Sequence, residues 1–126
     1  MSDDLTTPAG IESRLRQLVT DLTHAQQALA TARDAEVRAK HTYEAARRRA
    51  LLSEDCPKVS RGQVTTAERD AWVDEATKHE RWAYELAVVR REAAQDHLRI
   101  LRDQAVIVMS LASSVRAAYA VAGSGL

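Results

Sequence analysis

Four histidines and one cysteine are the side chains of this chain best suited to metal binding or catalysis. Metal sites in helical bundles use Glu-x-x-His motifs on facing helices, and the nearest match here is Asp21 with His24. A helical hairpin would place His97 opposite that pair. The same register would bring together a second group, which consists of His41, His79 and Glu75. Because the inward glutamates of such sites are missing, we expect these residues to flank a helix seam, with no metal site and no cofactor.

The remaining chemistry-bearing residues give no sign of catalysis. The single cysteine, Cys56, follows Asp55, whose negative charge disfavours the reactive thiolate. The chain carries no Gly-rich phosphate loop, no G-x-S-x-G motif and no strand-turn-helix pattern to hold one. We therefore expect no catalytic residues and no enzyme.

Composition points to one small helical protein. The chain has 126 residues, of which 45% are hydrophobic, 4% aromatic and 29% charged, a length that suits a single domain. The 18 basic and 18 acidic residues cancel, so the net charge does not favour a polyanion partner. A lone cysteine fits a reducing compartment. The N-terminus lacks the features of a secretory signal, and the uncharged C-terminal run is shorter than the ~20 apolar residues of a membrane span. We expect a soluble, cytoplasmic protein without membrane contact.

The first half of the chain predicts one long helix over residues 8–53. Thr7 and Pro8 supply an N-cap and a first-turn proline. Apolar residues then recur at alternating steps of four and three, which is the heptad seam of a coiled coil. The predicted seam residues are Leu15, Leu18, Leu22, Ala25, Leu29, Ala32, Ala39, Tyr43, Ala46 and Ala50. Glu36 is the one polar residue at a seam position.

A turn and a second long helix follow. Pro57 and Gly62 predict a tip loop over residues 54–65, and Thr65 with Glu68 has capping-box spacing. The second helix is expected over residues 66–122. Its seam shifts by four residues after Leu86 and then continues from Ala94 to Ala122. The predicted residues of the first part of this seam are Trp72, Ala76, His79, Ala83 and Leu86. We predict an all-α fold, a long antiparallel hairpin of two helices, as a single domain over residues 8–122. Residues 1–7 and 123–126 would form flexible ends.

The segment QAVIVMSLASSV, residues 104–115, is uncharged on all sides of the second helix. One neighbouring helix cannot bury four consecutive apolar residues, because they point in four directions. We therefore expect a homo-oligomer, most simply a dimer with a four-helix core, or else an N-terminal segment folded over this surface. The predicted interface residues are Val106, Ile107, Val108, Met109, Leu111, Val115 and Tyr119.

Basic residues gather at the predicted tip, where they would contact a protein partner or a phosphate backbone. They are Arg47, Arg48, Arg49, Lys58 and Arg61, partly offset by Glu54 and Asp55. Tyr43 and Trp72 occupy seam positions, whereas Trp82 lies off the seam and is the better candidate for an exposed aromatic side chain.

The stretches DCPKVSRGQVTTAERDAWV, EAAQDHLRILRDQA and SLASSVRAAYA resemble small all-helical proteins of tailed phages of actinobacteria, from about Glu36 onward. This resemblance implies a phage or prophage product that acts in the host cytoplasm. The chain is also similar, more faintly, to phage nuclease-inhibiting proteins of the Gam type, which are long-helix dimers. A DNA mimic should be acidic, however, and this chain is neutral. The WXG secretion family is excluded, because the turn has no Trp-x-Gly.

We therefore predict a non-enzymatic coiled-coil interaction protein that binds and modulates a host or phage protein. The alternative is a nucleic-acid-binding or DNA-metabolism accessory protein of the recombination or nuclease-inhibitor type. Such a protein would contact DNA or a nuclease through the basic tip.

Overall fold

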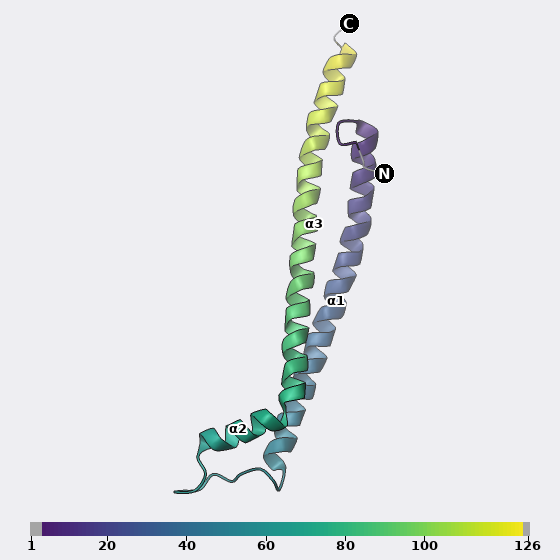
Figure 1. Ribbon diagram of the computed structural model, residues 1–126. Helices are drawn as coiled ribbons and strands as arrows, with labels where there is room; N and C mark the ends of the chain where they lie inside the picture. The colour runs from purple at the N-terminus through teal and green to yellow at the C-terminus, as the bar shows by residue number, and fades with distance from the viewer. Residues whose placement is uncertain (1–3, 125–126) are drawn as a thin grey trace. The chain divides into compact units, whose positions relative to one another are not determined.

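The computed structural model describes residues 4–124, which form three α-helices (Figure 1). Helix α1 spans Pro8–Leu52, α2 spans Thr66–Ala76 and α3 spans Lys78–Ser124. The prediction of an all-helical protein is confirmed. Met1–Asp3 and residues 125–126, parts of the predicted flexible ends, lie outside the described residues, and α3 continues through Gly123 to Ser124.

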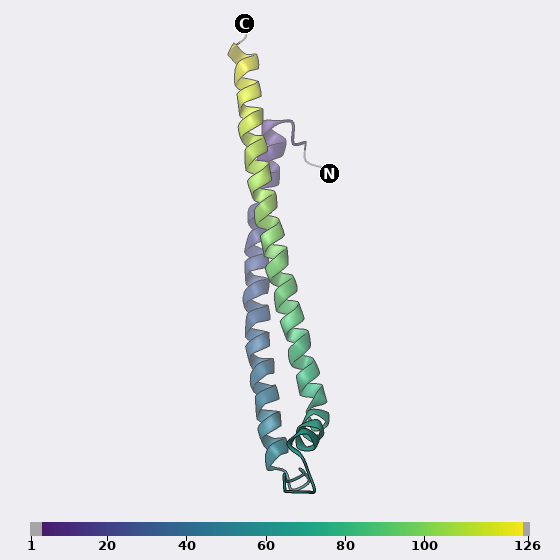
Figure 2. The same ribbon diagram turned by 90° about the vertical axis from the view of Figure 1, so that its left-hand side faces the viewer.

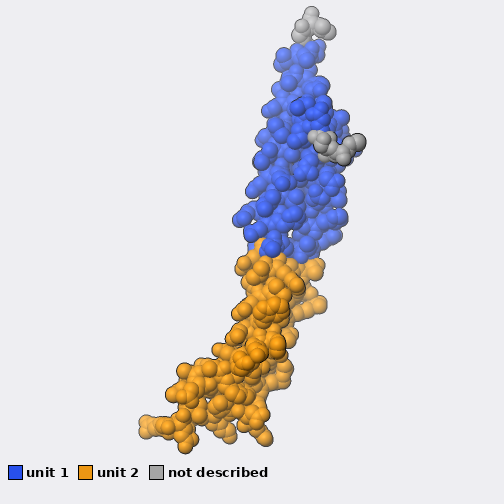
Figure 3. Space-filling model, viewed as in Figure 1, with its two compact units in different colours: residues 1–30, 93–126 blue, residues 31–92 orange. Residues whose placement is uncertain are grey.

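The chain divides into two compact units (Figure 3), where the sequence predicted one domain. Unit 1 comprises residues 1–30 and 93–126, and unit 2 comprises residues 31–92. Each unit contains a part of α1 and a part of α3, so the two long helices pass through both units.

Helix α1 begins where the sequence predicted. The backbone N–H of Gly10 donates to the Thr7 hydroxyl at 3.1 Å, and that hydroxyl donates to the Asp4 carbonyl at 3.2 Å. Hydrogen bonds from the Thr6 hydroxyl and Thr6 backbone N–H lower the pKa of Asp4. A Cβ atom on Gly10 would lie 1.7 Å from the Asp4 carbonyl oxygen. Residues 4–7 therefore lie against the first turn of α1, and only glycine at position 10 leaves room for them.

Unit 1 has an apolar core between α1 and α3, which lie side by side in both views (Figures 1 and 2). The predicted α1 seam is confirmed here, and Leu18 is only 1% exposed. The buried cluster consists of Ile11, Leu18, Ala25, Leu29, Leu98, Leu101 and Val108. Nearby, Arg14 donates to the Gln104 side chain at 3.3 Å. The last turns of α3 extend beyond the first turn of α1 (Figure 1).

Unit 2 is held together by polar and aromatic contacts as well as buried apolar residues. Its buried residues are Ala46, Cys56, Val73, Thr77 and Ala87. Arg91 donates to Glu36 at 2.7 Å, with side chains that are 25% and 22% exposed. Tyr43 and Tyr84 have ring centroids 6.1 Å apart. Glu36, the polar residue at a predicted seam position, therefore has a charged partner on α3.

The second helix differs from its prediction, because it is interrupted at Thr77. Thr77 has φ −115° and ψ 16°, outside helical values. Its hydroxyl donates to the Val73 carbonyl at 2.8 Å, yet Thr23 makes the same kind of bond to Val19 within the continuous α1. The hydroxyl bond alone therefore does not break the helix. Thr77 differs from Thr23 in being 1% exposed, so we attribute the break to packing in unit 2 that overrides local helix propensity.

The predicted seam of this region is also corrected. Ala76, His79 and Ala83 are exposed, whereas Tyr84 is partly buried and Ala87 is buried. Buried or partly buried positions run from Thr77 to Val115 in an unbroken alternation of threes and fours, with no shift of four. These positions are Thr77, Glu80, Tyr84, Ala87, Arg91, Ala94, Leu98, Leu101, Ala105, Val108, Ala112 and Val115. The pattern was missed because Glu80 and Arg91 are charged.

The tip loop between α1 and α2 ends in a tight turn. The Ser60 N–H donates to the Val64 carbonyl at 3.2 Å, and the Gln63 N–H donates to the Ser60 carbonyl at 3.3 Å. Gly62 has φ 81°, a left-handed conformation that favours glycine. Thr65 then caps α2 by accepting from the Glu68 N–H at 3.1 Å, which is one half of the predicted capping box.

Candidate interaction surfaces

The C-terminal half of α3 carries an exposed apolar surface in unit 1. Val106, Ile107 and Met109 are 64%, 60% and 62% exposed, whereas Val108 between them is 5% exposed. Helix α1 therefore buries only one of the four consecutive residues 106–109. Leu111, Tyr119 and Val121 are also exposed among the described residues, and Asp4 lies against Gly10. The sequence prediction that this run exceeds its own chain's cover is confirmed.

Two of the predicted interface residues need correction. Val108 belongs to the buried core of unit 1, and Val115 is partly buried against that core. Both occupy the seam that faces α1, so they are not available to a second molecule. The surface that remains, called the α3 apolar surface below, consists of Ile100, Val106, Ile107, Met109, Leu111, Tyr119 and Val121.

By length and composition alone, α3 also suffices to cross a membrane. An 18-residue stretch within Lys78–Gly123 has a mean hydropathy of 1.6, and 6% of it is buried. The uncharged C-terminal run was predicted to be too short for a membrane span, whereas this helix is long and apolar enough. Core helices of soluble proteins pass the same test of length and composition.

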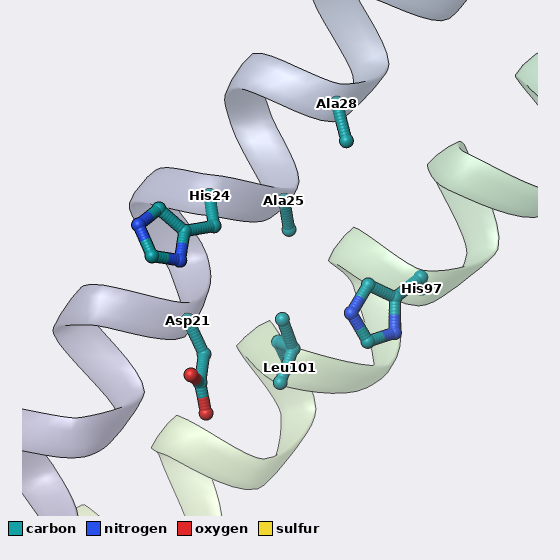
Figure 4. Close-up of a pocket in the computed structure, with 6 residues that line it drawn as sticks. All are labelled: Asp21, His24, Ala25, Ala28, His97 and Leu101. Atoms are coloured by element: carbon teal, nitrogen blue, oxygen red, sulfur yellow. The ribbon is translucent and has the colours of Figure 1, made fainter.

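A hollow in unit 1 brings together the first predicted histidine group (Figure 4). This open hollow of about 420 Å³ is lined by Asp21, His24, Ala25, Ala28, His97 and Leu101. The prediction that His97 lies near Asp21 and His24 is therefore confirmed. Figure 4 shows His24 on α1 and His97 on α3, with Ala25 and Leu101 between the two rings.

The second predicted histidine group lies in unit 2. Glu75 pairs with Lys78 at 2.8 Å, and this hydrogen bond lowers the pKa of Glu75. His79 lines a different hollow, together with Trp82 and Glu85. Among the residues that the structure describes, no group of three His, Cys, Asp or Glu side chains is arranged to hold a metal ion. Trp82 is exposed, as predicted.

Arg47 does not belong with the exposed cations of the tip. It donates to Asp74 at 2.9 Å and to the Tyr43 hydroxyl at 3.4 Å, and its guanidinium lies 5.9 Å from the Tyr43 ring centroid. These contacts, first the bond to Tyr43 and then the bond to Asp74, raise the pKa of Arg47. The arginine is therefore used in packing α1 against α2.

The other four predicted tip cations are exposed: Arg48, Arg49, Lys58 and Arg61. No role was predicted from the sequence for the apolar residues near Lys58. Leu51, Leu52 and Val59 are exposed and line a hollow at the tip with Lys58 and Arg69. In the sequence, Leu51 and Leu52 follow the last predicted seam residue, and neither occupies a seam position. This apolar pair could have indicated an exposed apolar surface. Cys56 lines the same hollow but is buried, with its thiol 3.7 Å from the Pro57 carbonyl.

No family model, no curated protein sequence and no solved structure matches this chain.

Proposed function

We propose that this protein is a non-enzymatic coiled-coil hairpin that forms a homodimer through α3 and binds a protein partner with its tip. The antiparallel hairpin is supported by contacts within each unit. In unit 1, Arg14 meets Gln104, while the hollow joins residues 21–28 to His97 and Leu101. In unit 2, the partner of Glu36 is Arg91 and the partner of Arg47 is Asp74. In both units, residues later in α1 contact residues earlier in the segment formed by α2 and α3. This is the contact pattern of an antiparallel hairpin.

The α3 apolar surface supports the proposed self-association. Fully burying one Val, Ile, Leu or Met side chain is worth roughly 1.5–3 kcal/mol, and seven apolar side chains of this surface are exposed. The gross gain of about 10–20 kcal/mol per chain is an upper bound. It is comparable to or larger than the association cost of about 4–15 kcal/mol. A second copy is therefore the economical cover for this surface.

Sedimentation of the purified protein at several concentrations tests self-association. We expect a dimer for the wild type, and a Leu111→Asp change that raises the dimer dissociation constant by about 100-fold or more, because it places a charge in a buried apolar contact. Leu111 is exposed within its own chain, so helix content by circular dichroism should not change in the monomeric variant.

The matched control is Ser113→Asp, which adds the same charge at an exposed polar position two residues away. This variant should remain dimeric. A wild-type protein that sediments as a monomer at every concentration would contradict the proposal.

The tip is the surface proposed for the protein partner. Lys58, one of its four exposed cations, lines the tip hollow with Leu52 and Val59, which are exposed apolar residues. Protein interfaces combine an apolar centre with a charged rim, whereas a phosphate backbone requires only the charges. We propose that the partner is a host or phage protein in the host cytoplasm, as the resemblance to phage proteins implies.

A pull-down from host lysate with two tip variants tests this role. The first variant changes Arg48, Arg49, Lys58 and Arg61 to Ala, and the second changes Leu52 and Val59 to Ser. We expect both to lose the same specific protein that the wild type retains. A control variant with Arg33 and Arg38 changed to Ala, which are exposed cations away from the tip, should retain it.

Nucleic-acid binding by the tip is the second candidate, favoured by the same four exposed cations. It predicts binding to single- or double-stranded DNA that weakens steeply with salt and is lost in the four-alanine variant. Fluorescence anisotropy at low salt measures it. A flat titration with both kinds of strand would remove this candidate.

A further inference from the structure

A regular second stripe runs along α3 beside the seam that faces α1, and it includes Ile100, Ile107 and Leu111 of the α3 apolar surface. Its members are Ile100, Gln104, Ile107, Leu111, Ser114 and Ala118. Each precedes one position of the α1-facing heptad frame, such as Leu101, Ala105 or Val108. One residue of an α-helix turns by about 100°, so the second stripe faces a direction roughly perpendicular to α1. A helix with two such stripes occupies the corner of a four-helix bundle.

We propose that this stripe pairs with the same stripe of a second copy in antiparallel orientation, with the two-fold axis level with Met109. This inference rests on the proposed self-association and specifies its geometry. The axis places Ile107 opposite Leu111, with Gln104 opposite Ser114 and Ile100 opposite Ala118. Polar residues thus meet polar residues, and a large side chain meets a small one. The stripe is self-complementary, as an isologous two-fold interface requires.

The hollow of unit 1 provides an independent reason for this orientation. The same pairing brings Tyr119 of one copy level with Arg99 of the other, midway between His97 and Leu101, which line the hollow. Asp21, His24 and Ala28, the α1 residues at the hollow, lie on the flank of α1 that also carries Arg14, the partner of Gln104 in the stripe. The exposed Tyr119 ring would therefore enter the open hollow of the second copy, where its hydroxyl would find polar groups.

A parallel pairing lacks this complementarity. It would place Gln104 against Gln104 and Ile100 against Ile100, and both bare ends of α3 would lie at one end of the dimer. Tyr119 would then face the second copy's bare end instead of its hollow. The antiparallel pairing lays the uncovered end of each α3 along unit 1 of the other copy.

Disulfide trapping distinguishes the two orientations. In a Cys56→Ala background, Ile100→Cys and Ala118→Cys chains are prepared separately and mixed, then oxidised with copper phenanthroline. Residues 18 apart on a helix are separated by about 27 Å, far beyond the ~7 Å limit for disulfide formation between Cα atoms. We expect cross-linked dimers in the mixture and none in either variant alone. Both positions are exposed, so circular dichroism should show unchanged helix content.

Tyr119→Ala supplies a second readout that needs no cross-link. We expect it to raise the dimer dissociation constant by about tenfold or more, as truncation of a buried aromatic anchor does. Ser113→Ala, an exposed neighbour, should leave the constant unchanged.

Three outcomes would contradict the antiparallel pairing, and they can be distinguished from one another. Cross-linking of each variant alone, with no gain on mixing, would establish a parallel dimer and overturn this inference. A dimer by sedimentation without any cross-link would overturn it through a different register. A monomer by sedimentation would overturn the proposed self-association as well. If that monomer also cosedimented with phosphatidylglycerol vesicles, the occupant of the surface would be lipid.

Discussion

The two compact units of this protein each contain a part of α1 and a part of α3, and unit 2 also contains α2, but the units differ in how their helices are joined. Unit 1 is joined by Ile, Leu, Val and Ala side chains, with Leu18 and Leu101 buried at its seam. Unit 2 uses the ion pairs Glu36–Arg91 and Arg47–Asp74 and the contact between Tyr43 and Tyr84. Unit 1 therefore depends on packing volume, whereas unit 2 depends on specific partners.

Apolar side chains remain exposed in both units. The seam of unit 2 uses charged groups that are satisfied by partners within the same unit. In unit 1 most of the exposed large apolar side chains lie on α3, whereas in unit 2 they include Leu52 and Trp82. The part of the chain with the simplest core is thus the part for which we propose a second copy as cover.

The largest expected effect comes from the core of unit 1. Leu18→Ala removes a side chain that is 1% exposed and leaves a cavity, so the free energy of unfolding should fall by about 2–5 kcal/mol. Urea unfolding followed by circular dichroism at one protein concentration measures it. Val19→Ala, at an exposed neighbouring position, should change the free energy by less than about 0.5 kcal/mol. Equal losses in the two variants would contradict a packed seam at Leu18.

A smaller effect is expected from the ion pair of unit 2. Glu36→Ala removes the carboxylate partner of Arg91, and we expect a loss well below that of Leu18→Ala, because both side chains of the pair still reach solvent. The double variant Glu36→Leu with Arg91→Leu gives unit 2 an apolar seam like that of unit 1. It should recover most of the loss or exceed wild-type stability. A double variant that is less stable than Glu36→Ala would show that unit 2 requires the charges.

The smallest expected effect concerns the helix break. Thr77→Val keeps the shape of the side chain but removes the buried hydrogen bond to Val73, so unfolding should become easier by about 1 kcal/mol. Thr23→Val removes an equivalent bond at an exposed position of α1. That control should change stability by only a few tenths of a kcal/mol, because water replaces the lost partner. Similar losses in both variants would mean that burial at Thr77 has no special role.

Much of this fold was predictable because heptad spacing survives in a single sequence. The α1 seam, the Thr7 and Thr65 caps, the turn at Gly62 and the register between Asp21, His24 and His97 all followed from spacing and turn chemistry. The seam of unit 2 did not, because its Glu80 and Arg91 positions look like solvent-facing residues. The break at Thr77 depends on tertiary packing, which local propensity does not encode.

The candidate surfaces were predictable to a similar degree. Four consecutive apolar residues on a helix must leave some exposed, so the exposure of residues in this run, which are Val106, Ile107 and Met109, was predictable. The burial of Val108 and Val115 depends on which side α1 occupies. Arg47 is not an exposed tip cation because it pairs with Asp74, which lies 27 positions away on a separate helix. Neither of these two facts can be read from local sequence.

The reaction rate of the buried Cys56 thiol can report how often unit 2 opens. Because Cys56 is buried in the native state, we expect a thiol reagent such as a disulfide dye to react mainly when the surrounding loop opens. The rate of colour development therefore measures how often unit 2 opens, in wild-type protein and without any introduced label. The same rate, followed while a tip-binding partner is titrated, would register engagement of the tip as slower reaction.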